Sequence, residues 1–106
     1  MPKYMIEGSY TAEGLKGLYK DRSKGRTAAI SAAVKSAGGK LETLYWCLGD
    51  ADAIVIADFP DTPGAAAFAL AASASGMVRT KTTVLLTAAE LDKALGSKVG
   101  YRAPGK

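Results

Sequence analysis

The sequence contains no histidine and a single cysteine among its 106 residues. The absence of histidine removes the most common general base, the most common metal ligand and the usual proximal ligand of haem. The lone Cys47 excludes an internal disulfide and leaves too few sulfur ligands for an ordinary zinc or iron–sulfur site. We therefore expect no metal and no cofactor. A chain without disulfides is also typical of the cytoplasm.

Long apolar runs are absent as well. The most apolar stretch, residues 65–74, is too short and too rich in alanine to span a membrane. Residues 1–3 lead directly into an alternating strand pattern, without the apolar segment of a secretion signal. We therefore expect a cytoplasmic protein without a membrane partner. The net charge of +4 is compatible with anionic partners, although we interpret it as the charge that keeps a small protein in solution.

Hydrophobic periodicity and turn residues divide the chain into short elements. Its length predicts one domain, residues 1–106, with a small core. The expected elements, in chain order, are a strand at 4–10, helices at about 12–20 and 26–37 with a polar break between them, strands at 41–48 and 53–59 joined by a turn at 49–52, a helix from 61 or 62 to about 74, a strand at 77–86, a helix between Thr87 and Gly96, and an irregular tail at 97–106.

This order predicts an α+β fold of the ferredoxin-like βαββαβ type with an added C-terminal helix. Its antiparallel sheet would have the strand order 4-1-3-2. Gly14 and Gly17 weaken the first helix and would suit close packing or bending. Phe68 and Leu70 are the expected anchors of the alanine-rich helix, and Thr87 with Glu90 has the spacing of a capping box.

The central hairpin is apolar on both faces. Residues 41–48 alternate without a clearly polar side, and residues 53–57 are apolar throughout. Such strands are typical of a sheet that is covered twice. Since the predicted helices cover one face, we expect a second subunit on the other, in a homodimer or a larger homo-oligomer.

Charged residues in the middle of strands are the best candidates for a ligand-binding site. Glu7 interrupts an otherwise apolar strand, and Arg79 or Lys81 on a neighbouring strand could pair with it. Ser9 and Tyr45 could line the same space, as could Cys47, which we expect to be an inert thiol without a histidine to activate it. The alternative is a structural ion pair or a solvated sheet face.

A second candidate is the basic cluster that precedes the helix starting at Thr27. Arg26 and the backbone of Thr27 could hold an anion at this helix N-terminus. The alternative is a solvated loop, and without interleaved aromatics we expect no nucleic-acid partner. The turn residues Asp50 and Asp52 could hold a cation, but they lack the further oxygen ligands of a calcium loop. We interpret this turn as a hairpin connection.

Several short motifs, taken in order, resemble the GYD-domain family of small bacterial and archaeal proteins. They are Arg26, Gly38-Gly39, Gly49 with Asp52, Pro60-Asp61 and the run Gly76-Met77-Val78-Arg79-Thr80. The sequence departs from the family at Ala51, where the name-giving turn has a tyrosine. The resemblance implies a fold similar to the dimeric α/β barrels, in which two ferredoxin-like sheets pack face to face.

The resemblance does not choose a function, because such barrels include small monooxygenases, muconolactone isomerases and sensors of small ligands. We expect a small, partly apolar ligand in a cavity between sheets, between sheet and helices or between subunits. One alternative is a cofactor-independent oxygenase or isomerase in which Glu7, Arg79 or Lys81 polarises the substrate. Another is a non-enzymatic assembly or sensing module in which these charges are structural.

Overall fold

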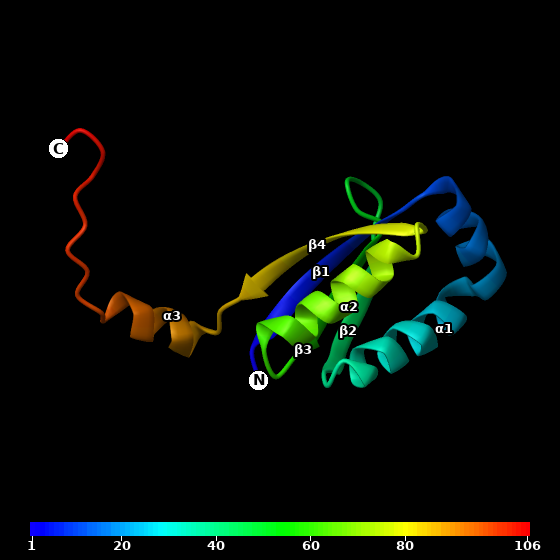
Figure 1. Cartoon of the computed structure of the whole chain (residues 1–106), viewed down its shortest axis with the longest axis horizontal. Coiled ribbons are helices and arrows are strands. Elements are labelled where there is room, and N and C mark those ends of the chain that lie inside the picture. The colour runs from blue at the N-terminus through cyan, green and yellow to red at the C-terminus, as the bar shows by residue number, and fades with distance from the viewer.

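Four antiparallel strands form the centre of the molecule, with two helices on one face (Figure 1). The computed structural model describes residues 1–106. Its elements are β1 (Lys3–Tyr10), α1 (Ala12–Ser36), β2 (Lys40–Trp46), β3 (Ala53–Asp58), α2 (Thr62–Ala74), β4 (Val78–Leu85) and α3 (Ala88–Leu95). The expected α+β class and antiparallel sheet are confirmed. No helix combines the length and the apolar content needed to cross a membrane.

The sheet has the strand order β2-β3-β1-β4, which is β4-β1-β3-β2 when it is read from the other edge. β1 lies between β3 and β4, and Glu7 is opposite Ile54 on one side and Lys81 on the other. A register shift in β2 between Leu41 and Thr43 interrupts its pairing with β3. The sheet therefore has two open edges, β2 and β4.

Alternation along the two central strands separates a helix-facing side from an open side. Every second residue of β1 from Tyr4 to Gly8, and of β3 from Ala53 to Ala57, is buried beneath the helices. The residues between them are half-buried, although no helix covers them. One face of the sheet thus carries the core, and we call the other the open face.

The core centres on Phe59, whose side chain is fully buried. Its ring lies edge-on to Tyr4 at a centroid distance of 5.9 Å and close to Phe68 at 6.1 Å. Val34 from α1 and Ile6 from β1 are also fully inside. These contacts join both helices to the sheet.

Helix α1 is bent where the sequence predicts a break. Arg22 has φ 62° and ψ 176°, a conformation outside the helical region, and the helix resumes directly after it. The break is therefore one residue, narrower than the predicted polar segment. The helix begins at the cap Thr11, whose hydroxyl accepts from the backbone N–H of Gly14 at 3.1 Å. It ends before Gly38, which has a positive φ of 84° and is the glycine expected at this end.

Helix α2 begins at the expected cap, because the Asp61 carboxylate accepts from the backbone N–H of Gly64 at 2.9 Å. Phe68 is buried, as predicted. The prediction for Leu70 is wrong, since its side chain is 69% exposed. Two residues along a helix rotate the side chain by about 200°, so Phe68 and Leu70 cannot both face the sheet.

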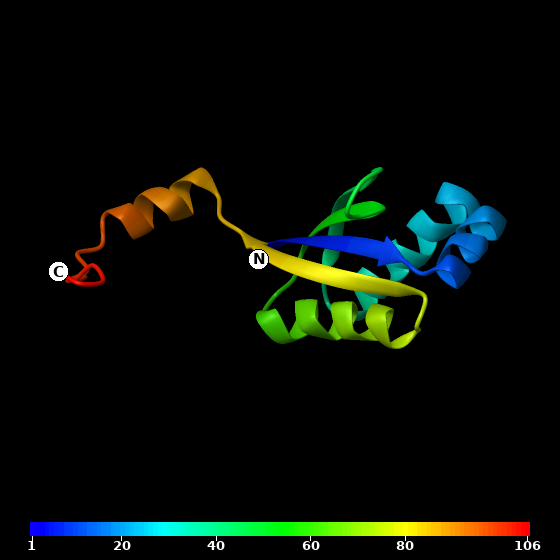
Figure 2. The ribbon, with the colours of Figure 1, turned by 90° about the horizontal axis from the view of Figure 1, so that it is seen from above.

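Helix α3 and the residues after it form an arm that extends from the end of β4 (Figure 2). The predicted capping box is present: the Thr87 hydroxyl accepts from the Glu90 backbone N–H at 3.1 Å, and the Glu90 carboxylate accepts from the Thr87 backbone N–H at 3.0 Å. The hydrogen bond from the Thr87 backbone N–H to the Glu90 carboxylate is the main cause that lowers the pKa of this carboxyl. Residues 86–102 are all exposed, including Leu91, Leu95 and Tyr101. We call residues 86–106 the C-terminal arm.

Candidate functional site

A cavity of about 640 Å³ lies between α1, α2 and the helix-facing side of the sheet. We call it the interhelical cavity. It exists because the two helices present small side chains toward each other. Ala29 and Ala33 line it from α1, and Ala67 and Ala71 line it from α2. A methyl group cannot bridge the space that leucine or phenylalanine would fill between two helices.

The floor and one end of the cavity are apolar. Ile6 and Val55 rise from the sheet, Ile30 comes from α1 and Phe68 from α2. Of the 23 residues that line the cavity, 14 are hydrophobic. A concave apolar site with a few polar groups, at a volume of about 300–1,000 Å³, is the usual form of a small-molecule site.

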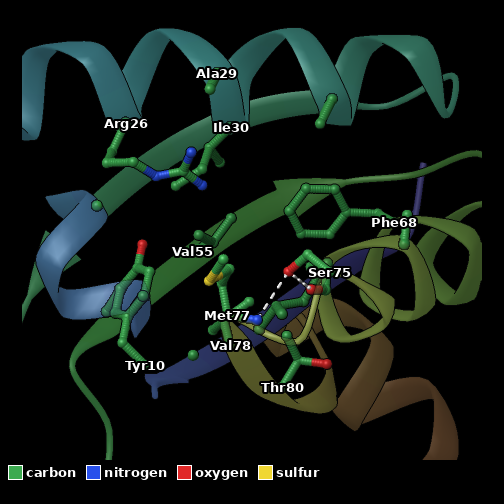
Figure 3. A pocket seen from close by; sticks show the side chains of 18 of the residues that line it. Tyr10, Arg26, Ala29, Ile30, Val55, Phe68, Ser75, Met77, Val78 and Thr80 are labelled. Carbon is green, nitrogen blue, oxygen red and sulfur yellow. Dashed lines mark hydrogen bonds between the residues drawn. The ribbon is translucent and has the colours of Figure 1, made fainter. Parts of the chain in front are cut away.

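Arg26 supplies the cationic group of the cavity (Figure 3). Its side chain extends from α1 into the space above Val55 and is 31% exposed. The Nε atom is buried and has no hydrogen-bond partner. Asp21 lies 3.9 Å from Nη1, which is too long for a hydrogen bond. Arg26 thus has unused hydrogen-bonding capacity.

Other hydroxyl groups in the cavity are already engaged. Thr80 Oγ1 lies 3.0 Å from Ser73 Oγ, and Ser75 Oγ donates to the carbonyl of Ala72 at 2.6 Å. The Tyr10 ring, by contrast, points its hydroxyl toward the same space as Arg26 (Figure 3). Arg26 and Tyr10 are therefore the groups best placed to orient a polar atom of a bound molecule.

The five predicted ligand-binding residues lie together, but on the open face rather than in the interhelical cavity. The register places Glu7 opposite Lys81 and Ser9 opposite Arg79, while Tyr45 lies one strand further, opposite Ile54. No ion pair joins Glu7 to either base. Their role in ligand binding stays a prediction.

The two residues predicted to bind an anion, Arg26 and Thr27, lie within α1. Arg26 lines the interhelical cavity, whereas Thr27 does not. No group of three or more acidic or sulfur side chains comes together as a metal site would require. The Cys47 thiol is half-buried and donates to the carbonyl of Ala51 at 3.1 Å.

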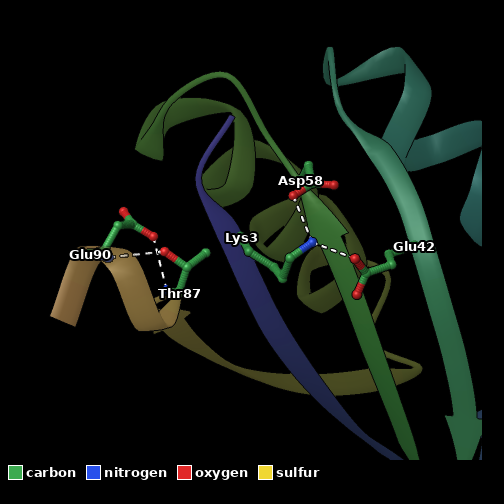
Figure 4. Close-up of polar contacts among 5 residues, drawn as sticks. All are labelled: Lys3, Glu42, Asp58, Thr87 and Glu90. Carbon is green, nitrogen blue, oxygen red and sulfur yellow. Dashed lines mark hydrogen bonds and ion pairs between the residues drawn. The ribbon is translucent and has the colours of Figure 1, made fainter. Parts of the chain in front are cut away.

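The remaining charges of the open face form a network around Lys3 (Figure 4). Its ammonium group donates to Glu42 and, at 3.0 Å, to Asp58. These hydrogen bonds raise the pKa of Lys3, the one to Glu42 most strongly. The network ties β1, β2 and β3 together at the end of the open face that is farthest from Glu7 and Arg79.

The match of the chain to known families decides its identity. The model of the GYD domain matches residues 4–95, from the first strand to the last helix. The chain belongs to the GYD domain family. The resemblance drawn from its short motifs is therefore confirmed. Among curated proteins, none matches this GYD-domain protein.

In this GYD-domain protein the turn after β2 is tied to the end of β1. The Asp52 carboxylate accepts from the backbone N–H of Tyr10 at 2.8 Å, and the Ser9 hydroxyl donates to the carbonyl of Asp50 at 2.8 Å. Ala51, at the position of the family tyrosine, contributes only its backbone carbonyl, to Cys47. These bonds support the interpretation of the turn as a hairpin connection.

Sequence reasoning missed most of the walls of the interhelical cavity. The available signal was the spacing of alanines at Ala29 and Ala33 in one helix and at Ala67 and Ala71 in the other. That spacing also fits two helices in close contact. Only the structure shows that the two stripes face each other across an open space.

Proposed function

We propose that this GYD-domain protein binds a small, largely apolar molecule in the interhelical cavity. The volume of about 640 Å³ and the mainly hydrophobic lining carry this proposal. The cavity opens between exposed stretches of α1 and α2, so a ligand can enter without unfolding the core. Binding buries apolar surface of both the ligand and the helices, which favours the complex.

The neutral dye Nile red tests this proposal, because its fluorescence rises in apolar surroundings. We expect the wild-type protein to bind it and Ala33→Phe to weaken binding by about tenfold or more, since the new ring fills the cavity. Ala32→Phe is the matched control, because Ala32 is exposed on α1 and does not line the cavity. Equal binding by both variants would contradict the proposal.

We also propose a ferredoxin-like homodimer in which two open faces pack together. The order βαββαβ, the antiparallel sheet and the GYD domain match support this class of fold. Met5, Ile54 and Ile56 form an apolar centre on the open face, with charges of both signs on either side. A two-fold axis can set basic groups of one chain against acidic groups of the other.

The lone Cys47 is compatible with our proposed compartment, the cytoplasm.

Light scattering measures this association. We expect the wild-type protein to have about twice the mass of one 10.9 kDa chain at micromolar concentration. Ile56→Arg should yield monomers, because it places an unpaired charge in the proposed interface. Ser31→Arg adds the same charge to an exposed position on α1 and should leave the dimer intact. A monomeric wild-type protein would contradict the dimer proposal and would not affect the proposal that the interhelical cavity binds a ligand.

The catalytic alternative depends on this dimer. Glu7, Arg79 and Lys81 lie on the open face, so a substrate beside them would be enclosed only in a space between two subunits. The interhelical cavity is on the opposite side of the sheet. Binding in that cavity is therefore the function that the geometry of one chain supports best.

A further inference from the structure

Arg26 gives the interhelical cavity a chemical preference. A guanidinium group carries five N–H donors, and its Nε donor here is buried without an acceptor. The Nε atom itself is shielded, whereas the Arg26 side chain as a whole is 31% exposed. The terminal part of the guanidinium group extends toward the cavity, where the acceptor of a bound molecule can reach it (Figure 3).

The guanidinium group fits a carboxylate. Its N–H donors lie in one plane in a fixed fork, which matches the two oxygens of a carboxylate. Asp21 lies 3.9 Å from Nη1, beyond hydrogen-bond distance, so the terminal N–H donors are available to a ligand. The hydroxyl of Tyr10 points toward the same space and can donate to one of the two oxygens (Figure 3).

The remaining charges of the cavity disfavour a multiply charged ligand. Asp21 and Glu13 line the same cavity, and both are exposed to solvent. Two carboxylates near the entrance would repel a multiply charged phosphate more strongly than a monocarboxylate. Beyond Arg26 the walls are apolar, with Ile30 on one side and Phe68 on the other.

We propose that the ligand is an amphipathic monocarboxylate. Its carboxylate pairs with the terminal Nη groups of Arg26, and its apolar part lies between α1 and α2 against Ile30 and Phe68. This inference rests on the proposed function, because it names the class of molecule that the interhelical cavity binds.

Displacement of Nile red by decanoate and by decanol, below their aggregation limits, tests the class of ligand. The two competitors share an alkyl chain and differ in the charged group. In the wild-type protein we expect decanoate to compete at about tenfold lower concentration than decanol, because charge-assisted bidentate hydrogen bonds are the strong ones. In Arg26→Gln we expect this difference to disappear, with the affinity for Nile red within about threefold of the wild type.

Arg102→Gln is the matched control, since it removes the same group from the exposed C-terminal arm and should preserve the preference for decanoate. If circular dichroism shows that Arg26→Gln does not fold, Arg26→Lys replaces it. This variant keeps the positive charge but loses the planar guanidinium group, so the preference for decanoate over decanol should become smaller. Equal competition by decanoate and decanol in the wild type, with Nile red bound, would overturn this inference alone. Failure of the wild type to bind Nile red would instead overturn the proposed function, and this inference with it.

Discussion

Replacing Phe59 with alanine should lower the free energy of unfolding by about 3–5 kcal/mol. The ring is fully buried and contacts both Tyr4 and Phe68, so its removal leaves a cavity where the helices meet the sheet. Only 12 of the 106 residues are buried, so few other contacts can take up the loss. Small domains have a total stability of about 5–15 kcal/mol, and this one substitution would remove a large share of it.

Urea unfolding, followed by circular dichroism, measures the effect of Phe59→Ala as a fall in the midpoint concentration. Tyr101→Ala is the control, because Tyr101 is an aromatic residue that is 77% exposed in the C-terminal arm. It should change the free energy of unfolding by less than about 0.5 kcal/mol. Equal effects of the two substitutions would show that Phe59 is not the centre of the core.

Gly14→Ala should destabilise the protein by about 2–3 kcal/mol, because the added Cβ has no room. It would overlap the backbone carbonyl of Met77 and lie 2.9 Å from Cδ1 of Tyr10. That carbonyl accepts from the Thr11 backbone N–H at 2.9 Å, so it cannot move away without breaking the bond that docks the start of α1 on β4. The substitution therefore separates two elements that the structure holds in contact.

Gly17→Ala is the matched test, because it makes the same change one turn along the same helix. A Cβ at Gly17 would meet no atom within 4 Å. Alanine is favoured over glycine inside helices, so Gly17→Ala should raise stability by about 0.5–1 kcal/mol. The same unfolding measurement compares both variants, and a loss of stability in Gly17→Ala as large as that in Gly14→Ala would contradict this account of close packing.

Features set by a few neighbouring residues were predictable from the sequence. Thr87 and Glu90 form the expected capping box, and Asp61 caps α2, because both depend on hydrogen bonds across three positions. Gly14 was expected to allow close packing or bending, and it lies against Met77. The break in α1 was also expected, although not its restriction to Arg22.

Features set by distant segments were not predictable. Alternation assigned Glu7 and Tyr4 to opposite faces of β1, but it did not show which face the helices cover. The hydrophobic Leu70 was predicted to anchor α2 because composition alone does not fix the rotation of a helix. The interhelical cavity depends on how far apart α1 and α2 lie, and no local pattern specifies that distance.

The position of a bound molecule tests the central claim most directly. Isotope-labelled protein can be titrated with decanol, whose neutral head group removes any general attraction to basic residues. If the account holds, the largest changes in NMR chemical shift will come from Ile30, Val55 and Phe68 around the interhelical cavity. Changes concentrated at Ile54 and Ile56 on the open face, with the cavity residues unaffected, would contradict it.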